Sequence, residues 1–167
     1  LALGRLVMQA GLPVRMVVLV AAVENAISAD AFRPGDILNS RKGLTIEIGN
    51  TDAEGRLILA DALVRATELK PDVILDVATL TGHMVIALGD RVAGVLGSDD
   101  IVGGVLAAGE GAGEAMWPMP IPEAIVDRVK ASQIADLLQH DGVRWGGGLF
   151  AAAYLREFTA DLPWAHL

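Results

Sequence analysis

The apolar positions of the chain follow two patterns, a helical spacing at the start and an uninterrupted run soon after it. Residues 1–10 predict the end of a helix, because their apolar side chains recur at three- and four-residue intervals (Leu3, Leu6, Val7 and Ala10). Residues 16–23 are all apolar, and they predict a strand buried on both faces. A helix, a short loop and a buried strand in succession are typical of an α/β protein with a largely parallel sheet.

The next stretch places two short apolar segments on either side of a helical pattern. Residues 24–44 are rich in turn-forming residues and predict a long connection, which in a compact domain usually has a function. Residues 45–48 and 72–78 predict strands, and residues 55–69 predict the helix between them. This order can form a βαβ unit, whose crossover would be right-handed if its strands are parallel.

The rest of the chain continues this alternation of short apolar runs and helical patterns. Residues 84–88 fit either a strand or a short helix. Further segments predict strands at 92–96 and 164–167, an extended proline-rich stretch at 117–122, and helices at 99–113, 122–129 and 149–158. We therefore predict one α/β domain over residues 1–167, part of a three-layer α/β/α architecture with a central mixed, largely parallel sheet.

Two carboxylates stand two positions apart in the sequence Asn-Thr-Asp-Ala-Glu-Gly-Arg-Leu, residues 50–57. In an extended segment Asp52 and Glu54 would point the same way, and their repulsion at close approach would be on the order of 4 kcal/mol. A divalent cation relieves such repulsion and accepts oxygen ligands. The alternative is a polar turn in which Asp52 caps the following helix and Glu54 lies in its first turn.

A second turn, Thr79-Leu80-Thr81-Gly82, follows the strand predicted at residues 72–78. In open α/β sheets, ligands bind outside the carboxyl ends of the strands. Both turns can therefore fall on the same functional edge of the sheet, and this expectation depends only on the order of the elements.

Composition narrows the range of functions. The 167 residues are 53% apolar with few aromatic side chains, which suits a buried sheet flanked by helices of small residues. The chain has no cysteine, which excludes disulfide frameworks, thiolate zinc sites and cysteine nucleophiles and fits a reducing compartment. The net charge of −8 disfavours nucleic acid as the main partner. We find no secretory signal and no apolar run long enough to cross a membrane.

The eight residues 50–57 match, at every position, the signature of the leucyl (cytosol) aminopeptidase family. The chain resembles that family over essentially its whole length, because further stretches follow in the family's order. These stretches are Glu24-Asn25, Arg33-Pro34-Gly35-Asp36, residues 59–63, residues 76–82, residues 87–89, Trp117-Pro118-Met119-Pro120, Ala135-Asp136 and Trp164-Ala165-His166-Leu167.

The resemblance implies a cytoplasmic, metal-dependent aminopeptidase, usually a homohexamer, which hydrolyses N-terminal residues such as leucine from peptides by means of water activated at two metal ions. Asp52 would bind one ion and Glu54 would bridge two, with Mn²⁺, Zn²⁺ or Mg²⁺ as the candidates. Arg56 would be the catalytic residue that holds a bicarbonate or the gem-diolate near the attacking water. The backbone around Thr79, Leu80 and Gly82 would bind the peptide substrate.

The chain also departs from the family's pattern. The family's other metal ligands, a Lys and two Asp, and its second catalytic Lys lie in motifs before the stretch that begins here at Leu1. We therefore expect a fragment of the C-terminal catalytic domain that holds only part of the dinuclear site. The family's Asn shortly after Ala135-Asp136 is replaced here by Gln139, and its Gly-Gly-Arg loop is altered at residues 141–146. The alternative function is a catalytically incompetent module that only binds metal or serves in assembly.

The remaining polar residues carry weaker signals. His83, His140 and His166 lack the spacing of metal ligands, so we expect structural or surface positions, although His83 could touch the substrate pocket. Asp61 and Asp76 are expected on a helix surface and in a strand rather than as ligands.

Overall fold

The strands of the protein form two mixed sheets on either side of a central helix, α6 (Gly147–Arg156). The computed structural model describes residues 1–167. The other helices are α1 (Ala2–Gln9), the 3₁₀ helix η1 (Thr51–Ala53), α2 (Gly55–Glu68), α3 (His83–Leu88), α4 (Asp99–Ala112) and α5 (Glu123–Val129). The strands are β1 (Ile37–Asn39), β2 (Thr45–Glu47), β3 (Ile74–Asp76), β4 (Ala93–Gly97), β5 (Met116–Pro118), β6 (Leu137–Leu138) and β7 (Trp164–His166).

Both sheets mix parallel and antiparallel pairs, which confirms the predicted α/β class. The three-stranded sheet has the order β1-β2-β6, with β1 antiparallel and β6 parallel to β2. The four-stranded sheet has the order β3-β7-β4-β5, and only its β4–β7 pair is antiparallel. The predicted central sheet is therefore divided into two smaller sheets.

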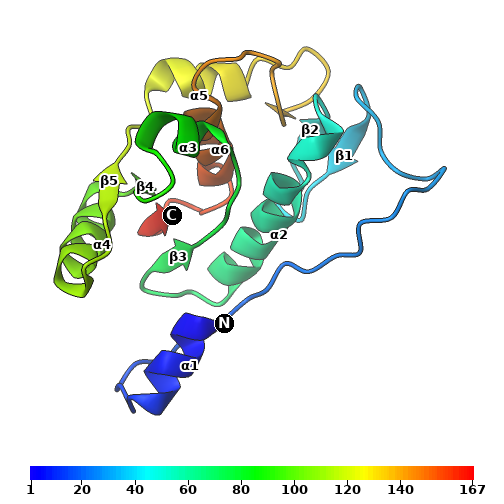
Figure 1. Cartoon of the computed structure of the whole chain (residues 1–167). Helices are drawn as coiled ribbons and strands as arrows, with labels where there is room; N and C mark the ends of the chain where they lie inside the picture. The colour runs from blue at the N-terminus through cyan, green and yellow to red at the C-terminus, as the bar shows by residue number, and fades with distance from the viewer.

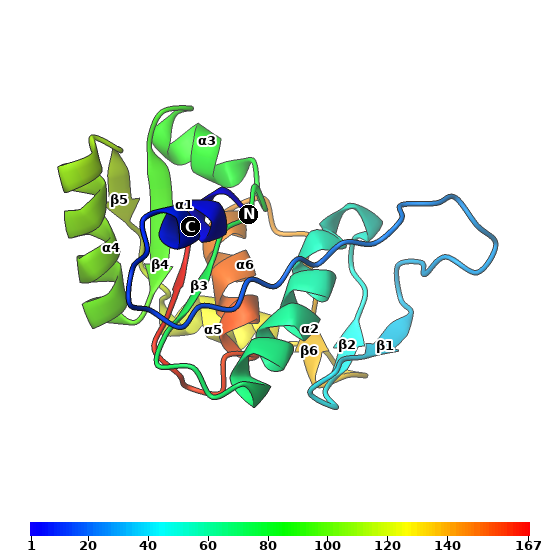
Figure 2. The ribbon, with the colours of Figure 1, turned by 90° about the horizontal axis from the view of Figure 1, so that it is seen from below.

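The helices are layered around the larger sheet. Helix α4 contacts β4, β5 and β7 on one face, and α6 contacts β4 on the other (Figure 1). Helices α2 and α5 pack against α6, and the three-stranded sheet lies beyond α2 (Figure 2). This arrangement is consistent with the predicted three-layer α/β/α architecture.

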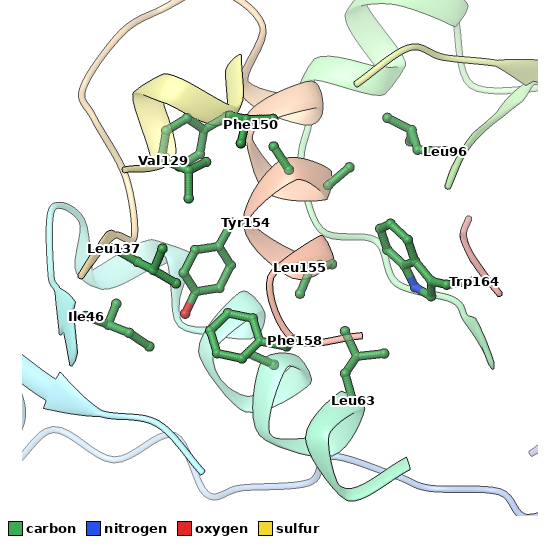
Figure 3. Close-up of a cluster of buried hydrophobic side chains, with 14 of the residues drawn as sticks. Ile46, Leu63, Leu96, Val129, Leu137, Phe150, Tyr154, Leu155, Phe158 and Trp164 are labelled. Carbon is green, nitrogen blue, oxygen red and sulfur yellow. The ribbon is translucent and has the colours of Figure 1, made fainter. Parts of the chain in front are cut away.

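The hydrophobic core surrounds α6. Its apolar residues from Phe150 to Leu155 are buried all round the helix, a pattern that marks a fully enclosed helix. Figure 3 shows Ile46 and Leu137 from the smaller sheet on one side of α6 and Leu96 and Trp164 from the larger sheet on the other. The core therefore joins the two sheets through one helix.

The prediction of a strand at residues 16–23 is wrong. These residues belong to neither sheet, and no residue from 15 to 27 donates a backbone hydrogen bond. Their side chains remain largely exposed, and Met16 and Val18 lie against Gly4 of α1. An apolar run becomes a strand only where a neighbouring strand satisfies its backbone groups, and no strand pairs with this one.

The predicted βαβ unit is also wrong, although its three elements exist. Strand β2 has β1 on one edge and β6 on the other, so neither edge is open to β3. Strand β3 instead pairs with β7, which lies about ninety residues later in the chain. The sequence signals for β1 and the two-residue β6 were missed, and residues 84–88 are helical, one of the two options left open.

Asp76 links β3 to β7 through both of its carboxylate oxygens. Its Oδ2 accepts a hydrogen bond from Nε1 of Trp164 at 2.6 Å, and its Oδ1 lies 2.5 Å from Nδ1 of His166. All three side chains are buried. As predicted, Asp76 is a strand residue, and His166 has a structural position within the sheet. Asp61 also lies on a helix surface, where its Oδ1 accepts the backbone N–H of Arg41.

The tight packing of α6 leads to a testable prediction. Ala153 is fully buried, so Ala153→Leu should force its neighbours apart and lower the free energy of unfolding by about 1–3 kcal/mol. Ala107→Leu is the matched control, because Ala107 is exposed on α4. Urea denaturation followed by circular dichroism measures both variants. Equal stabilities for the two would contradict the close packing of α6.

Candidate functional site

The segment of residues 50–57, here called the carboxylate loop, is a helical turn rather than an extended segment. Residues 51–53 form η1, and the Asn50 side chain caps it by accepting the backbone N–H of Asp52 at 3.0 Å. A 3₁₀ helix has three residues per turn, so positions two apart differ in direction by about 240°. The expectation that extended backbone turns Asp52 and Glu54 toward one point is therefore wrong.

The alternative, in which these carboxylates cap α2, is wrong as well. Glu54 itself occupies the N-cap position of α2 and makes no side-chain hydrogen bond to the helix. Asp52 lies in η1, before that position. Asp52 is exposed and Glu54 is half-buried, and neither carboxylate forms an ion pair. Both therefore keep their oxygens available for a cation.

Arg56 is the buried cation of the carboxylate loop. The residue is only 4% exposed, and its Nη1 donates to the backbone carbonyl of Gln139 at 2.9 Å. The guanidinium carbon lies 5.7 Å from the ring centroid of Phe150, a cation–π distance. Nε has no partner, and burial lowers the pKa of Arg56. A buried guanidinium without a bound carboxylate is a ready donor for an anion.

The turn of residues 79–82 lies beside the carboxylate loop. A Cβ added at Gly55, the first residue of α2, would lie 3.2 Å from Cδ1 of Leu80. Thr79 and Gly82 are exposed, and Leu80 is half-buried. The two turns therefore meet, but the strands before them lie in different sheets, so the expected shared edge of one sheet is wrong.

His83 lies against the first turn of α6. A methyl group at Gly147 would overlap the His83 ring, so the glycine permits this close approach. The neighbouring Gly148 provides space for Met84 and lies near the hydroxyl of Thr81. These contacts fix the turn of residues 79–82 against α6. They give His83 a packing role, and its contact with a substrate stays a prediction.

The loop after β6 adds a second group of charges near Arg56. Arg128 on α5 donates to Asp141 at 2.6 Å and to the carbonyl of Trp145 at 3.2 Å. Burial alone would raise the pKa of Asp141, but the hydrogen bonds from Arg128 and from the backbone N–H of Val143 lower it overall. Arg128 and Asp141 thus hold the altered glycine loop in one conformation.

His140 is favoured in its neutral form. Burial lowers its pKa, and the nearby charge of Arg56 lowers it further. Its Nδ1 accepts the backbone N–H of Gly142 at 3.0 Å, which requires Nδ1 to be unprotonated. The positive charge around Arg56 is therefore not increased by His140 at neutral pH.

The ligand chemistry of the carboxylate loop fits a divalent cation, but the number of ligands is small. Asp52 and Glu54 offer free carboxylate oxygens, which hard cations prefer. No group of three or more His, Asp or Glu side chains in the chain converges to hold a metal ion. If this segment binds a cation, the chain would offer it two carboxylates, Asp52 and Glu54.

Gln139 is the residue of the site whose importance the sequence did not reveal. It is fully buried beneath the carboxylate loop, where its side chain and backbone hydrogen-bond to residues 47–56. The available signal was its place at the end of an apolar stretch, where an isolated amide needs buried partners. One hollow of the surface lies elsewhere, at the C-terminal end of α6, between Lys42, Lys130 and Arg156.

Comparisons with known proteins match the chain to one family over nearly its whole length. The model of the cytosol aminopeptidase family, catalytic domain, matches residues 1–167. The chain is 49% identical to a probable cytosol aminopeptidase of Mycobacterium ulcerans over 160 residues, which are 95% of this chain and 31% of that protein. It is also 49% identical to the probable cytosol aminopeptidase of Mycobacterium tuberculosis (strain H37Rv) over 157 residues, 93% of this chain and 30% of that protein. The chain thus spans about a third of the length of these curated relatives.

The electrostatics of His140 predict a pH dependence of stability. Because its pKa is lower in the folded protein than the unfolded value of about 6.5, its neutral form contributes stability above that pH. This contribution is lost as the pH falls from about 6.5 through the lower folded pKa. His140→Gln should therefore lose less free energy of unfolding than wild type between pH 7.5 and pH 5.5. Urea titrations at both pH values measure the difference, and identical losses would contradict the prediction.

Proposed function

Since the chain belongs to the cytosol aminopeptidase family, we propose that it forms part of a metal-dependent aminopeptidase that releases N-terminal residues from peptides. The observation that carries this proposal is the site itself. Two carboxylates without ion pairs, Asp52 in η1 and Glu54 at the N-cap of α2, lie just before the buried cation Arg56. Because the chain spans only part of its relatives, the activity is proposed for the longer protein.

Asp52 and Glu54 are the residues that would hold the metal ions. In the proposal Asp52 would be a ligand to one ion and Glu54 would be a ligand to both, with Mn²⁺, Zn²⁺ or Mg²⁺ as the candidates. Divalent ions in such a centre supply Lewis acidity, which lowers the pKa of water and polarises a carbonyl group. The lack of a third converging ligand within the chain means that other segments would complete the centre.

Arg56 would stabilise negative charge that develops at the scissile carbonyl, or hold a bicarbonate close to it. Its free Nε and remaining N–H groups can donate to an oxyanion, and burial strengthens such interactions. Its hydrogen bond to the Gln139 carbonyl and its place over Phe150 restrict its side chain before substrate arrives. Little reorganisation is then needed during the reaction.

Thr79, Leu80 and Gly82 would bind the substrate's main chain through their backbone groups. Their turn lies against the carboxylate loop through Leu80 and Gly55, so a peptide bound there is close to Asp52 and Glu54. Exposed backbone in a turn fixed by packing can pair with an extended peptide without selecting its side chains. Such pairing would recognise peptides in general, whatever their side chains.

The assembly and cellular location are further parts of the proposal. We propose a homohexamer in the cytoplasm, in keeping with the family resemblance. The exposed apolar side chains of α1 and residues 16–23 would suit burial in a larger assembly. None of the helices is both long and apolar enough to cross a bilayer.

A second candidate function is a non-catalytic module that binds metal weakly or acts in assembly. The observation that favours it is the absence of any third ligand beside Asp52 and Glu54. The two functions differ in whether a protein that contains this chain hydrolyses peptides, so one activity assay separates them.

One prediction of the proposed function concerns Glu54. The full-length protein that contains this chain should hydrolyse leucyl-p-nitroanilide with added Mn²⁺, and Glu54→Ala should abolish this activity, because a bridging ligand is lost. Glu110→Ala is the control, since Glu110 is exposed on α4. Steady-state kinetics over a range of Mn²⁺ concentrations test it. Retained activity in Glu54→Ala would refute the assignment, and an inactive wild type would favour the non-catalytic module.

A further prediction distinguishes the effect of Arg56 on the stability of the fold from its role in catalysis. Arg56→Met should lower kcat by about 10²–10³-fold, as expected for the loss of one oxyanion donor. The free energy of unfolding should stay the same or rise, because an apolar side chain avoids the burial of a charge. Arg65→Met on the exposed face of the same helix should leave kcat unchanged. A variant that unfolds more easily but keeps its kcat would contradict this role.

A further inference from the structure

We propose that Gln139 is the positioning residue of the site, which holds the carboxylate loop and Arg56 in their working geometry. It touches neither substrate nor metal and acts through Asp52, Glu54 and Arg56. The catalytic consequence of this inference rests on the proposed function. The structural part, that Gln139 fixes the loop, does not.

The side-chain amide of Gln139 has all of its hydrogen-bonding capacity satisfied by the carboxylate loop and the residue before it. Oε1 accepts the backbone N–H groups of Gly49 at 3.1 Å and Asn50 at 3.0 Å. Nε2 donates to the backbone carbonyls of Asn50 at 2.7 Å and Ala53 at 2.9 Å. A primary amide has two donor hydrogens and two acceptor lone pairs, so no capacity remains.

The backbone of Gln139 extends this contact at both ends. Its N–H donates to the carbonyl of Glu47 at the end of β2, at 2.9 Å. Its carbonyl accepts Nη1 of Arg56 in the first turn of α2, at 2.9 Å. Gln139 therefore connects three parts of the site: the end of β2, the turn that carries Asp52, and the guanidinium of Arg56.

The close contact between the two segments supports this role. A methyl group at Gly49 would overlap the carbonyl oxygen of His140, so the loop lies directly on the backbone next to Gln139. The Gln139 side chain is fully buried, and bulk water cannot replace its hydrogen bonds. Loss of the amide would remove the hydrogen-bond partner of backbone groups of Gly49, Asn50 and the buried Ala53.

The shape of the residue is specific to this task. Methionine has nearly the same length and volume but neither donates nor accepts as an amide does. Glutamate can still accept from Gly49 and Asn50, but it would face the carbonyls of Asn50 and Ala53 without a hydrogen to donate. The variants Gln139→Met and Gln139→Glu therefore test the hydrogen bonds while they preserve the packing.

The experiment compares Gln139→Met with Gln133→Met in the full-length protein. Gln133 is exposed in the same segment, and its side chain hydrogen-bonds only to the carbonyl of Ala131, two residues away. In Gln139→Met, hydrogen exchange of the Gly49 and Asn50 amides should accelerate at least about tenfold. The Mn²⁺ concentration for half-maximal activity should rise by about 10–100-fold, as for other residues that orient metal ligands. Saturating Mn²⁺ should recover part of the lost kcat, an effect that general destabilisation would not give.

Each result decides a separate question. Unchanged exchange at Gly49 and Asn50 would overturn the structural role of Gln139. Faster exchange with an unchanged Mn²⁺ requirement and unchanged kcat would overturn its positioning role. An inactive wild type would refute the proposed function but leave the exchange result valid. If Gln139→Met fails to fold, Gln139→Glu provides the same readouts. If both fail to fold, unprotected Gly49 and Asn50 amides in the wild type would overturn the inference, and strong protection would support it.

Discussion

The burial of α6 from Phe150 to Leu155 is the constraint on which the rest of the structure depends. Three consecutive alanines, Ala151 to Ala153, are buried to within 1% of their surface, and the aromatic residues Phe150, Tyr154 and Phe158 fill the space towards the smaller sheet. Small side chains let neighbouring elements approach the helix, and large ones reach across to the second sheet. The two sheets have three and four strands, and both bury apolar side chains against α6. The helix gives both of them the apolar surface that they need.

The same helix also brings the parts of the site together. At its N-terminus, Gly147 and Gly148 accept His83 and Met84, so the turn of residues 79–82 is fixed to α6. One turn further along, Phe150 lies beneath the guanidinium of Arg56. The carboxylate loop and the turn of residues 79–82 come from different sheets, yet they share this support. Their contact through Gly55 and Leu80 follows from the packing of the core rather than from strand pairing.

This dependence explains which features the sequence could predict. The helices of residues 55–69 and 149–158 were predicted within a few residues, because their apolar spacing is a local property. The partner of β3 was not, since β7 lies far along the chain and nothing near β3 identifies it. Residues 16–23 have the composition of a buried strand, but composition cannot supply a neighbour. For the site, Asp52, Glu54 and Arg56 stood out through a motif, whereas nothing near Gln139 shows which groups it binds, because all of its side-chain partners lie about ninety residues earlier.

Arg56 and Tyr154 show where folding and chemistry make different demands. The Nε of Arg56 and the hydroxyl of Tyr154 are the two buried side-chain groups without a hydrogen-bond partner. Burial raises the pKa of Tyr154 and lowers that of Arg56, so the phenol stays neutral and provides no counter-charge. An unpaired buried charge opposes folding by roughly several kcal/mol, because the ion loses its hydration. Folding alone would favour an apolar residue at this position, whereas a site that must bind an oxyanion needs a cation with a free donor. The clamp of Gln139 on the same guanidinium is then understandable, because a charge that weakens the fold is useful only where it is held in place.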